Sequence, residues 1–399
     1  MGDAFNDALV LDEAYMMSTY ARKRVMFVRG EGMRLFDDEG HEYLDFVSGI
    51  GAVNLGHAHP AVAAAVSKQM SRLVHVSNLF YVEHRAELAQ RLAGLFGRPS
   101  RSFFCNSGTE AVEGAIKIAR KWGRTTRGPE CTTIVTAERS FHGRTLAALS
   151  ATGQPSKQQA FAPLMPGFKH VPLNDAASLE ASMTNDVCAV LLEPIQGEGG
   201  VYPCAKEYLA AARRLCDERG ALLMLDEVQT GFFRTGPAFA HQGYGVVPDV
   251  MTLAKAIANG LPAGAIVATE QAASVLRPGD HGSTFGGGPV VCAAALATID
   301  ALEVGRLGEN AENVGRRLRA GLEDLAARSG HITDVRGHGL MIGVSLATPN
   351  APYVATRALA RGVVLNTIGD STLRFLPPLV CTSAEVDTLL TVLSDVIGE

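Results

Sequence analysis

The sequence predicts an α/β protein with a parallel, doubly wound sheet and a smaller α+β domain. Short, continuously apolar runs recur between residues 103 and 255, as expected for strands that are buried on both faces. Helical stretches separate these runs, and strands that alternate with helices form parallel sheets. After residue 300 an amphipathic helix and several short strand-like pieces follow instead. At 399 residues the chain is too long for one small core, which also favours two domains.

The first elements are predicted from turn residues and apolar spacing. Residues 25–49 contain short apolar stretches interrupted by Gly32 and by the turn Asp38-Glu39-Gly40, which indicates a small antiparallel meander. Helical spacing begins at Pro60 and again after His84. The apolar residues with this spacing are predicted to lie in the core: Val62, Val66, Met70, Leu73, Leu88, Leu92 and Leu95.

The central runs are predicted strands. The first, ending at Cys105, stops at Asn106-Ser107-Gly108-Thr109, where an amphipathic helix begins. A helix is predicted from Lys206 to Arg219, where Gly220 ends it. The other predicted strands of this group are residues 132–137, 187–194, 221–227 and 249–255.

The last third of the chain predicts the smaller domain. A helical run over 290–304 precedes an amphipathic helix at 310–328, and a final helix is predicted over 383–397. Strand-like pieces lie between the last two helices, at 331–337, 339–347, 362–366 and 372–379. The predicted domain limits are 50–299 for the large domain and 300–399 for the small one, with residues 1–49 packing on the small domain.

Composition restricts the class of partner and the location. The net charge is −5 without a dense Lys/Arg block, which argues against nucleic acid or an anionic membrane as the partner. The seven scattered cysteines, with no C-x-x-C pair, predict buried thiols in a reducing compartment. The start lacks a basic region followed by an apolar one, and no apolar run reaches the ~18 residues of a membrane helix. We therefore expect a cytoplasmic protein.

An acid and a lysine close two of the predicted strands. Ligands of α/β sheets bind beyond the carboxyl ends of the strands, so Asp226 and Lys255 are expected to face one ligand. The pair suits pyridoxal phosphate (PLP), because an aspartate can keep the ring nitrogen protonated while a lysine amine forms a Schiff base with the aldehyde. Taken singly, a solvated turn and a surface lysine explain them better.

Other loops at the same edge carry groups that suit this ligand. Ser107-Gly108-Thr109 opens a helix, whose N–H groups bind anions, although an ordinary N-cap has the same residues. Phe141 can stack on a planar cofactor and Arg144 can clamp a carboxylate. A core phenylalanine and a surface ion pair explain them at least as well. Residues 193–200 (EPIQGEGG) add two acids in a glycine loop, for which a polar turn is the alternative.

Together these segments resemble a known family. The chain contains, in order, NSGTEAVEGAIKIAR, FHGRT, EPIQGEGG, LDEVQTGFFRTG, TLAK, STFGGGP and RFLPPL, and Lys255 follows Asp226 by 29 positions. Over nearly its whole length the sequence resembles class III (subgroup II) PLP-dependent aminotransferases, nearest to the acetylornithine aminotransferase branch. The resemblance implies PLP as cofactor and PLP fold type I, with a mostly parallel seven-stranded central sheet flanked by helices.

The resemblance also implies the cofactor residues. Lys255 matches the Schiff-base lysine and Asp226 matches the partner of the pyridinium nitrogen. Gln229 would bond the ring hydroxyl oxygen, and Phe141 would stack on the ring. The phosphate group would be held by Ser107, Gly108, Thr109 and, from the neighbouring subunit of a homodimer with shared active sites, Thr284.

Substrate roles follow from the same resemblance. Arg144 would bind the distal carboxylate of an ω-amino acid, and Arg374 the α-carboxylate of 2-oxoglutarate or glutamate. Glu198 would pair with Arg374 when no second carboxylate is present, which discriminates between substrates. Tyr20 matches a carboxylate-binding tyrosine of related ornithine enzymes. Ile50 stands where ornithine δ-aminotransferases have a second tyrosine, and an apolar residue there suits an acylated tail.

Some residues depart from the family or suggest other chemistry. Val112 and Gly288 each replace an asparagine that the family often has, without removing a catalytic group. His57 and His59 could suggest a metal site, and His142 a general base. With no carboxylate or cysteine at ligand spacing, we interpret them as structural and expect no metal.

The implied reaction moves the terminal amino group of N2-acetylornithine to 2-oxoglutarate, giving an aldehyde and glutamate, in arginine biosynthesis. Succinylornithine, succinyl-diaminopimelate and 4-aminobutyrate remain competing donors, because the sequence does not separate acyl groups. An aminomutase of the glutamate-1-semialdehyde type, a dialkylglycine decarboxylase and a non-catalytic PLP-binding protein are the alternatives from other classes.

Overall fold

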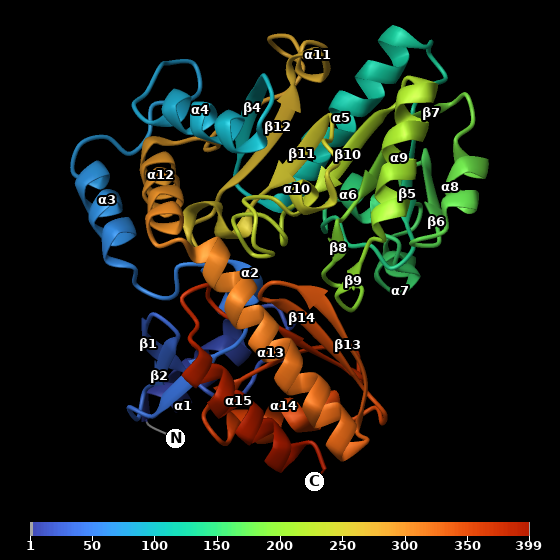
Figure 1. The fold of residues 1–399 in the computed structure, drawn as a ribbon. Coiled ribbons are helices and arrows are strands. Elements are labelled where there is room, and N and C mark those ends of the chain that lie inside the picture. The colour runs from blue at the N-terminus through green and yellow to red at the C-terminus, as the bar shows by residue number, and fades with distance from the viewer. Residues whose placement is uncertain (1–2, 399) are drawn as a thin grey trace.

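A seven-stranded sheet forms the centre of the upper part of the molecule (Figure 1). The computed structural model describes residues 3–398. The strand order is β4-β12-β11-β10-β7-β5-β6, and β12 alone runs antiparallel to its neighbours. The strands are β4 (Ser100–Cys105), β5 (Thr133–Ala137), β6 (Phe168–Val171), β7 (Val187–Leu192), β10 (Leu222–Asp226), β11 (Val250–Leu253) and β12 (Gly264–Thr269). The predicted mostly parallel central sheet is therefore confirmed.

Both faces of this sheet are covered by helices. In β10, Leu222 and Met224 pack on the face covered by α5 (Gly108–Thr126), whereas Leu223 and Leu225 pack on the face covered by α9 (Lys206–Arg219). Strands β5, β7, β10 and β11 are buried at every position, which explains their continuously apolar sequences. Helix α9 (Lys206–Arg219) has its predicted limits and ends at Gly220 in the left-handed conformation.

Two four-stranded sheets lie in the lower part of Figure 1. The predicted meander forms β1 (Phe27–Glu31), β2 (Arg34–Asp37) and β3 (Glu42–Asp45). A strand from the far end of the chain, β15 (Val363–Val364), pairs with β3 in parallel, so the first and last segments share one sheet. The other sheet contains β13 (Ile332–His338), β14 (Met341–Leu346), β17 (Thr372–Phe375) and β16 (Asn366–Ile368).

The helices of the lower part continue the apolar core of the upper part. One cluster of buried side chains extends from α4 and α12 into α13 and α15. The predicted domain boundary at 299/300 falls inside α12 (Pro289–Val304), and the domain limits stay predictions. Helix α4 (Arg85–Phe96) lies beside β4 in the upper part of Figure 1, whereas the lower part contains α13 (Leu307–Ser329), α14 (Ala351–Leu359) and α15 (Ser383–Val396).

Further elements complete the fold. Two of them follow strands of the central sheet: the helical turn η2 (Lys255–Ala258) and the two-stranded ribbon of β8 (Ile195–Gln196) and β9 (Tyr202–Pro203). The remaining elements are α1 (Asp3–Tyr15), α2 (Ser48–Gly51), α3 (Pro60–Met70), α6 (Leu146–Ala151), α7 (Pro155–Gln158), η1 (Gln159–Phe161), α8 (Ala176–Ser182), α10 (Ala240–Tyr244) and α11 (Glu270–Ala273).

Part of the predicted core is exposed. Val62 is buried in α3, but Met70 and Leu73 are 56% and 40% exposed, so the core prediction is wrong for these two. They lie at the end of α3 and beyond it, where residues 3–398 leave them exposed. All seven cysteines are buried and free, as predicted. Over residues 3–398, no helix is both long enough and apolar enough to cross a membrane.

Candidate active site

The loops that follow the parallel strands line one cavity of about 410 Å³. The strands β4, β5, β7, β10 and β11 share one direction, so their carboxyl ends meet at the same edge of the sheet. The predicted site residues that line this cavity are Ser107, Gly108, Thr109, Phe141, Arg144, Glu198, Asp226, Gln229 and Lys255.

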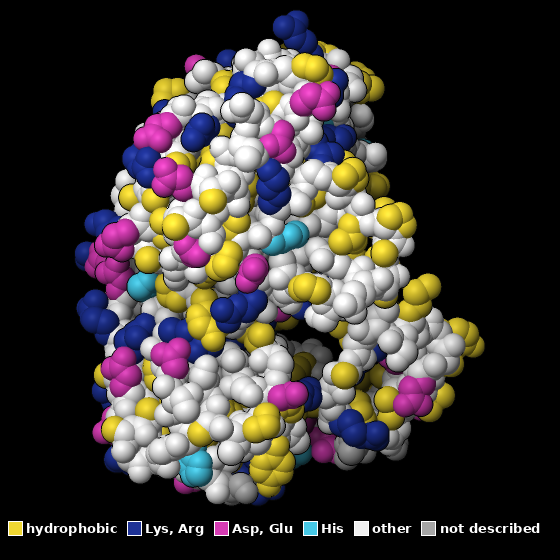
Figure 2. Space-filling model, turned by 90° about the vertical axis from the view of Figure 1, so that its right-hand side faces the viewer, with side chains coloured by type: hydrophobic (Ala, Val, Ile, Leu, Met, Phe, Trp, Pro, Cys, Tyr) yellow, Lys and Arg dark blue, Asp and Glu magenta, His cyan; other side chains and the backbone are white. Residues whose placement is uncertain are grey.

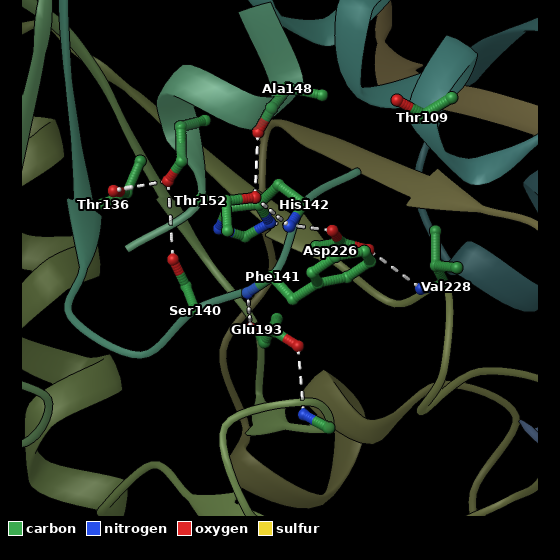
Figure 3. A network of polar contacts seen from close by, with 12 residues as sticks. Thr109, Thr136, Ser140, Phe141, His142, Ala148, Thr152, Glu193, Asp226 and Val228 are labelled. Atoms are coloured by element: carbon green, nitrogen blue, oxygen red, sulfur yellow. Dashed lines mark hydrogen bonds and ion pairs between the residues drawn. The ribbon is translucent and has the colours of Figure 1, made fainter. Parts of the chain in front are cut away.

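Asp226 ends β10 and is held in a buried network (Figure 3). Its side chain is 5% exposed, and His142 Nδ1 lies 2.8 Å from Asp226 Oδ2. The Val228 backbone N–H donates to Asp226 Oδ1 over 3.1 Å. The His142 side chain is fully buried, and its Nε2 has no hydrogen-bond partner within residues 3–398. Asp226 is therefore fixed at the cavity by two contacts.

Lys255 begins η2 with a positive φ of 48° and lines the same cavity. Burial lowers the pKa of its amine, and the negative charges of Glu198 and Asp226 oppose this effect only in part. A lowered pKa leaves more of the amine uncharged near neutral pH, as a nucleophile or base requires. The side chain is thus suited to both tasks.

The anion-binding end of the cavity is the first turn of α5. Ser107 is the N-cap, and its Oγ accepts a hydrogen bond from the Glu110 N–H over 3.3 Å. A Cβ atom at Gly108 would lie 2.9 Å from Val228 Cγ1, so only glycine fits there. Thr109 Oγ1 accepts hydrogen bonds from the backbone N–H groups of Arg144 and Thr145, both over 3.2 Å. The helix start therefore also fixes the Arg144 loop.

A buried arginine and a glutamate meet beside the cavity. Arg374 lies on β17 and its side chain is 1% exposed, and its Nη1 lies 2.5 Å from Glu198 Oε1. Arg374 also donates to Asn366 Oδ1 through Nε, over 2.9 Å, and to Gln229 Oε1, over 3.3 Å. Burial raises the pKa of the Glu198 carboxyl, but the Arg374 charge and hydrogen bond outweigh burial and leave that pKa below its usual value. Glu198 lines the cavity, whereas Arg374 does not.

Arg144 offers a second cation, at the exposed end of the cavity. Its guanidinium carbon lies 5.5 Å from the centre of the Phe141 ring. None of the carboxylates in residues 3–398 pairs with it, in contrast to Arg374. The two arginines therefore differ in availability, because one is open and the other is closed by Glu198.

Besides Arg374, three of the residues singled out for substrate or phosphate lie outside the cavity. Tyr20 is 76% exposed and its ring is near Arg22, and Thr284 is exposed. The role of Thr284 concerns a neighbouring subunit, and both roles stay predictions. Ile50 is 37% exposed, in a left-handed turn directly before Ala52, which lines the cavity.

Two cavity residues were given no role from the sequence. His142 was interpreted as structural, although it contacts Asp226. Glu193 accepts hydrogen bonds from the backbone N–H groups of Phe141, over 2.9 Å, and Gly197, over 3.0 Å. Burial raises the pKa of the Glu193 carboxyl to about 7. His142 lies within FHGRT and Glu193 lies within EPIQGEGG. The motifs therefore indicate the two segments, but not the contacts that these side chains make.

The donor groups of the cavity fit PLP and do not suggest a metal. A partly buried amine, a fixed buried carboxylate and a helix start with hydroxyl groups correspond to the aldehyde, ring nitrogen and phosphate of that cofactor. Across residues 3–398, no group of three or more His, Cys, Asp or Glu side chains is arranged to hold a metal ion. His57 instead contacts Asp45, with Nε2 2.7 Å from Oδ2.

Known relatives match this chain along nearly its whole length. Residues 15–397 match the family described as aminotransferase class-III. An acetylornithine aminotransferase from Gloeobacter violaceus is 50% identical, over 96% of this chain and 96% of its own. The protein of that name from Caldanaerobacter subterraneus is 46% identical, over 98% of this chain and 99% of its own.

Solved structures share the fold. An ornithine aminotransferase from Toxoplasma gondii has a TM-score of 0.94 and 33% identity, covering 98% of this chain and 94% of its own. A further structure of that enzyme is described with partial occupancy of PLP at the active site. An acetylornithine aminotransferase from Elizabethkingia anophelis has a TM-score of 0.88 and 33% identity, covering 98% of both chains. With its fold, its cavity and these relatives, the chain belongs to the class-III aminotransferase family and is a PLP-dependent aminotransferase.

Proposed function

We propose that this enzyme transfers the terminal amino group of N2-acetylornithine to 2-oxoglutarate, giving an aldehyde and glutamate, in arginine biosynthesis. The observation that carries the proposal is the unequal pair of arginines, with Arg144 open to the cavity and Arg374 closed by Glu198. Relatives of 46% and 50% identity that are named acetylornithine aminotransferase support the same donor. The apolar Ile50 near the cavity suits an acylated tail.

The cofactor roles are proposals for the same cavity. PLP, when bound, supplies an electron sink that makes the substrate carbon bearing the amine acidic. Asp226, held by His142, would keep the ring nitrogen protonated. The amine of Lys255 would take up the proton from that carbon and deliver it to the cofactor carbon that bore the aldehyde, C4′. The remaining cofactor contacts are proposed for Ser107, Gly108, Thr109, Phe141, Gln229 and, from a second subunit, Thr284.

The substrate roles explain how one cavity accepts two substrates. A donor with a single distal carboxylate would bind Arg144 while Glu198 keeps Arg374 neutralised. The second carboxylate of 2-oxoglutarate would displace Glu198 and take its place on Arg374. An uncharged group at that position would leave one buried charge unpaired, which is costly. Tyr20 is the least supported substrate residue, because it lies exposed outside the cavity.

A homodimer with shared active sites is also proposed. Large apolar side chains are exposed near Thr284, and the ring centre of Phe285 lies 5.3 Å from that of His75. Figure 2 shows the other side of the molecule, turned away from α3 and α4, where hydrophobic side chains border a separate hollow. The cluster of exposed apolar side chains near Thr284 favours a protein partner. The exposed apolar residues of this region are Met70, Leu73, Val74, Leu79, Phe80, Tyr81 and Phe285. A cytoplasmic location stays a prediction.

A half-reaction screen tests the proposed donor. The visible absorption of bound PLP would be followed after mixing with N2-acetylornithine, succinylornithine, succinyl-diaminopimelate or 4-aminobutyrate. We expect the highest kcat/KM for N2-acetylornithine, and a higher value for another donor would replace it. Product analysis with and without 2-oxoglutarate separates transamination from an aminomutase, which needs no 2-oxoglutarate, and from a decarboxylase, which releases carbon dioxide.

A further inference from the structure

One buried carboxylate joins the two loops that carry the proposed substrate residues. Glu193 directly follows β7 and is 7% exposed. Its Oε2 accepts the backbone N–H of Phe141 over 2.9 Å, and its Oε1 accepts the backbone N–H of Gly197 over 3.0 Å (Figure 3). Phe141 lies in the loop of Arg144, and Gly197 immediately precedes Glu198. The carboxylate therefore spans the loops of the open cation and of the closing acid.

The two loops are in direct contact around this bridge. Gln196 Nε2 donates to the Glu138 carbonyl over 2.8 Å. A Cβ atom at Gly199 would lie 2.6 Å from the Arg139 carbonyl oxygen, so the backbones approach closely there. Glu193 adds a side chain that accepts one N–H from each loop. An ionised carboxylate does this best, because both of its oxygens accept, whereas protonation weakens one oxygen as an acceptor and an amide directs its NH₂ group at one N–H.

The titratable groups around Glu193 come from four other segments. His142 lies in the Arg144 loop, Asp226 ends β10 and Lys255 begins η2. Cys204 follows β9, and its Sγ–H donates to the Glu193 backbone carbonyl over 3.3 Å. Burial raises the pKa of Glu193 to about 7, opposed by His142 and strengthened by Asp226. The bridging carboxylate therefore gains and loses its proton near neutral pH.

We propose that Glu193 is a positioning residue that sets the Arg144 loop against the Glu198 loop and so tunes recognition of both substrates. The proposal rests on the proposed function, because it takes Arg144 and Glu198 as the residues that meet the two carboxylates. Glu193 acts through these loops and through the backbone of Phe141. It is separate from the Arg374–Glu198 contact, which can open while the bridge stays closed.

The test compares Glu193→Gln with a matched control. Glutamine keeps the shape of the side chain but points an NH₂ group at one of the two N–H donors. Glu227→Gln is the control, because Glu227 is also fully buried and accepts backbone N–H groups, from Ala240 and His241, but does not line the cavity. Both variants lose one buried carboxylate, and only the first loses the bridge.

Amide hydrogen exchange reads the bridge directly, in the holoenzyme and in the cofactor-free protein. In Glu193→Gln, we expect the peptides that contain Phe141 and Gly197 to exchange at least tenfold faster, while peptides of α9 keep the wild-type rate. In Glu227→Gln, faster exchange should be confined to α10. Unchanged exchange at Phe141 and Gly197, within twofold, would overturn the proposal even in a protein that proves inactive with every donor of the screen.

Kinetics separate positioning from a general loss of folded protein. In Glu193→Gln, KM for the donor and for 2-oxoglutarate should rise at least tenfold, with a smaller fall in kcat. The wild-type kcat/KM should gain a component that increases through pH 7, and this component should be absent from Glu193→Gln. Glu227→Gln should keep both KM values and the wild-type pH profile. A Glu193→Gln enzyme with unchanged KM values and pH profile would contradict the proposed role.

Discussion

Replacing His142 by phenylalanine tests whether the imidazole supports Asp226. Because His142 Nε2 has no partner within residues 3–398, a ring of similar size removes a single side-chain contact, the one at 2.8 Å to Asp226 Oδ2. The backbone N–H of His142 keeps its own hydrogen bond to Thr152 Oγ1, over 2.9 Å. Asp226 would then retain the Val228 N–H as its one remaining hydrogen bond.

The expected size of the effect follows from this change in contacts. A hydrogen bond to a charged group contributes about 1.5–3 kcal/mol. If Asp226 acts in the rate-limiting proton transfer, that loss corresponds to a fall in kcat/KM of roughly 10- to 150-fold. The variant should still bind PLP, because the lysine and the first turn of α5 are unchanged.

A double-mutant cycle measures the contact itself. The kcat/KM of the amine half-reaction would be compared for wild type, His142→Phe, Asp226→Ala and the double variant. In the Asp226→Ala background, the second change should alter the rate less than about twofold, because its partner has gone. Should Asp226→Ala be too slow to measure, urea unfolding of the cofactor-free proteins gives the same coupling. A His142→Phe enzyme within threefold of wild type, or an equal effect in both backgrounds, refutes the reasoning.

Three further changes probe the remaining groups. Lys255→Ala should abolish turnover because no other amine lines the cavity of the described chain, and measurable steady-state turnover would contradict that role. Glu198→Ala leaves Arg374 without its counter-ion, so the rate with N2-acetylornithine should fall at least fivefold relative to the rate with glutamate, and unchanged partitioning would count against the switch. Burial raises the pKa of Glu193 from its usual 4.5 to about 7. The contribution of this side chain to the unfolding free energy is therefore complete below pH 4.5 and is lost as the pH rises through about 7. Between pH 5 and 8 the wild type should therefore lose about 2.5 kcal/mol of unfolding free energy relative to Glu193→Gln, which urea titrations of the cofactor-free proteins at both pH values would detect.

The central sheet was predictable because its strands are buried on both faces. Strands β5, β7, β10 and β11 have no solvent-facing side, so their sequences are continuously apolar and easy to find. The alternation of strands with helices predicted the parallel strands, but not the one exception, β12, because an apolar run does not encode its neighbour. The pairing of β12 with β4 and that of β15 with the meander both join segments that are far apart in the sequence. Helix α1 was missed because its side chains are mostly exposed and show no apolar stripe.

The site was predictable as a set of residues but not as a network. Each motif follows a strand that ends at the same sheet edge, so placing the motifs in one cavity required only the fold. The contact between His142 and Asp226 joins residues 84 positions apart, and the one between Phe141 and Glu193 spans 52. Such contacts depend on how two loops are placed against each other in the fold, and the spacing of residues within one motif does not predict that placement.

A buried arginine shows how the cofactor and substrate parts of the site are joined. Arg234 is fully buried with no carboxylate partner in residues 3–398, and burial lowers its pKa to about 9. It donates instead to the Leu340 carbonyl, over 3.0 Å, to the Pro377 carbonyl and to Asn54 Oδ1. Asn54 lies just after the turn of Ile50, Pro377 lies just beyond the strand of Arg374, and Leu340 lies in the turn between β13 and β14. The cofactor residues lie at the edge of the central sheet, and the Arg234 guanidinium connects the proposed specificity segments to that part of the molecule through hydrogen bonds. Burying a charge is costly, so packing alone would exclude an arginine here, and this connection favours retaining it.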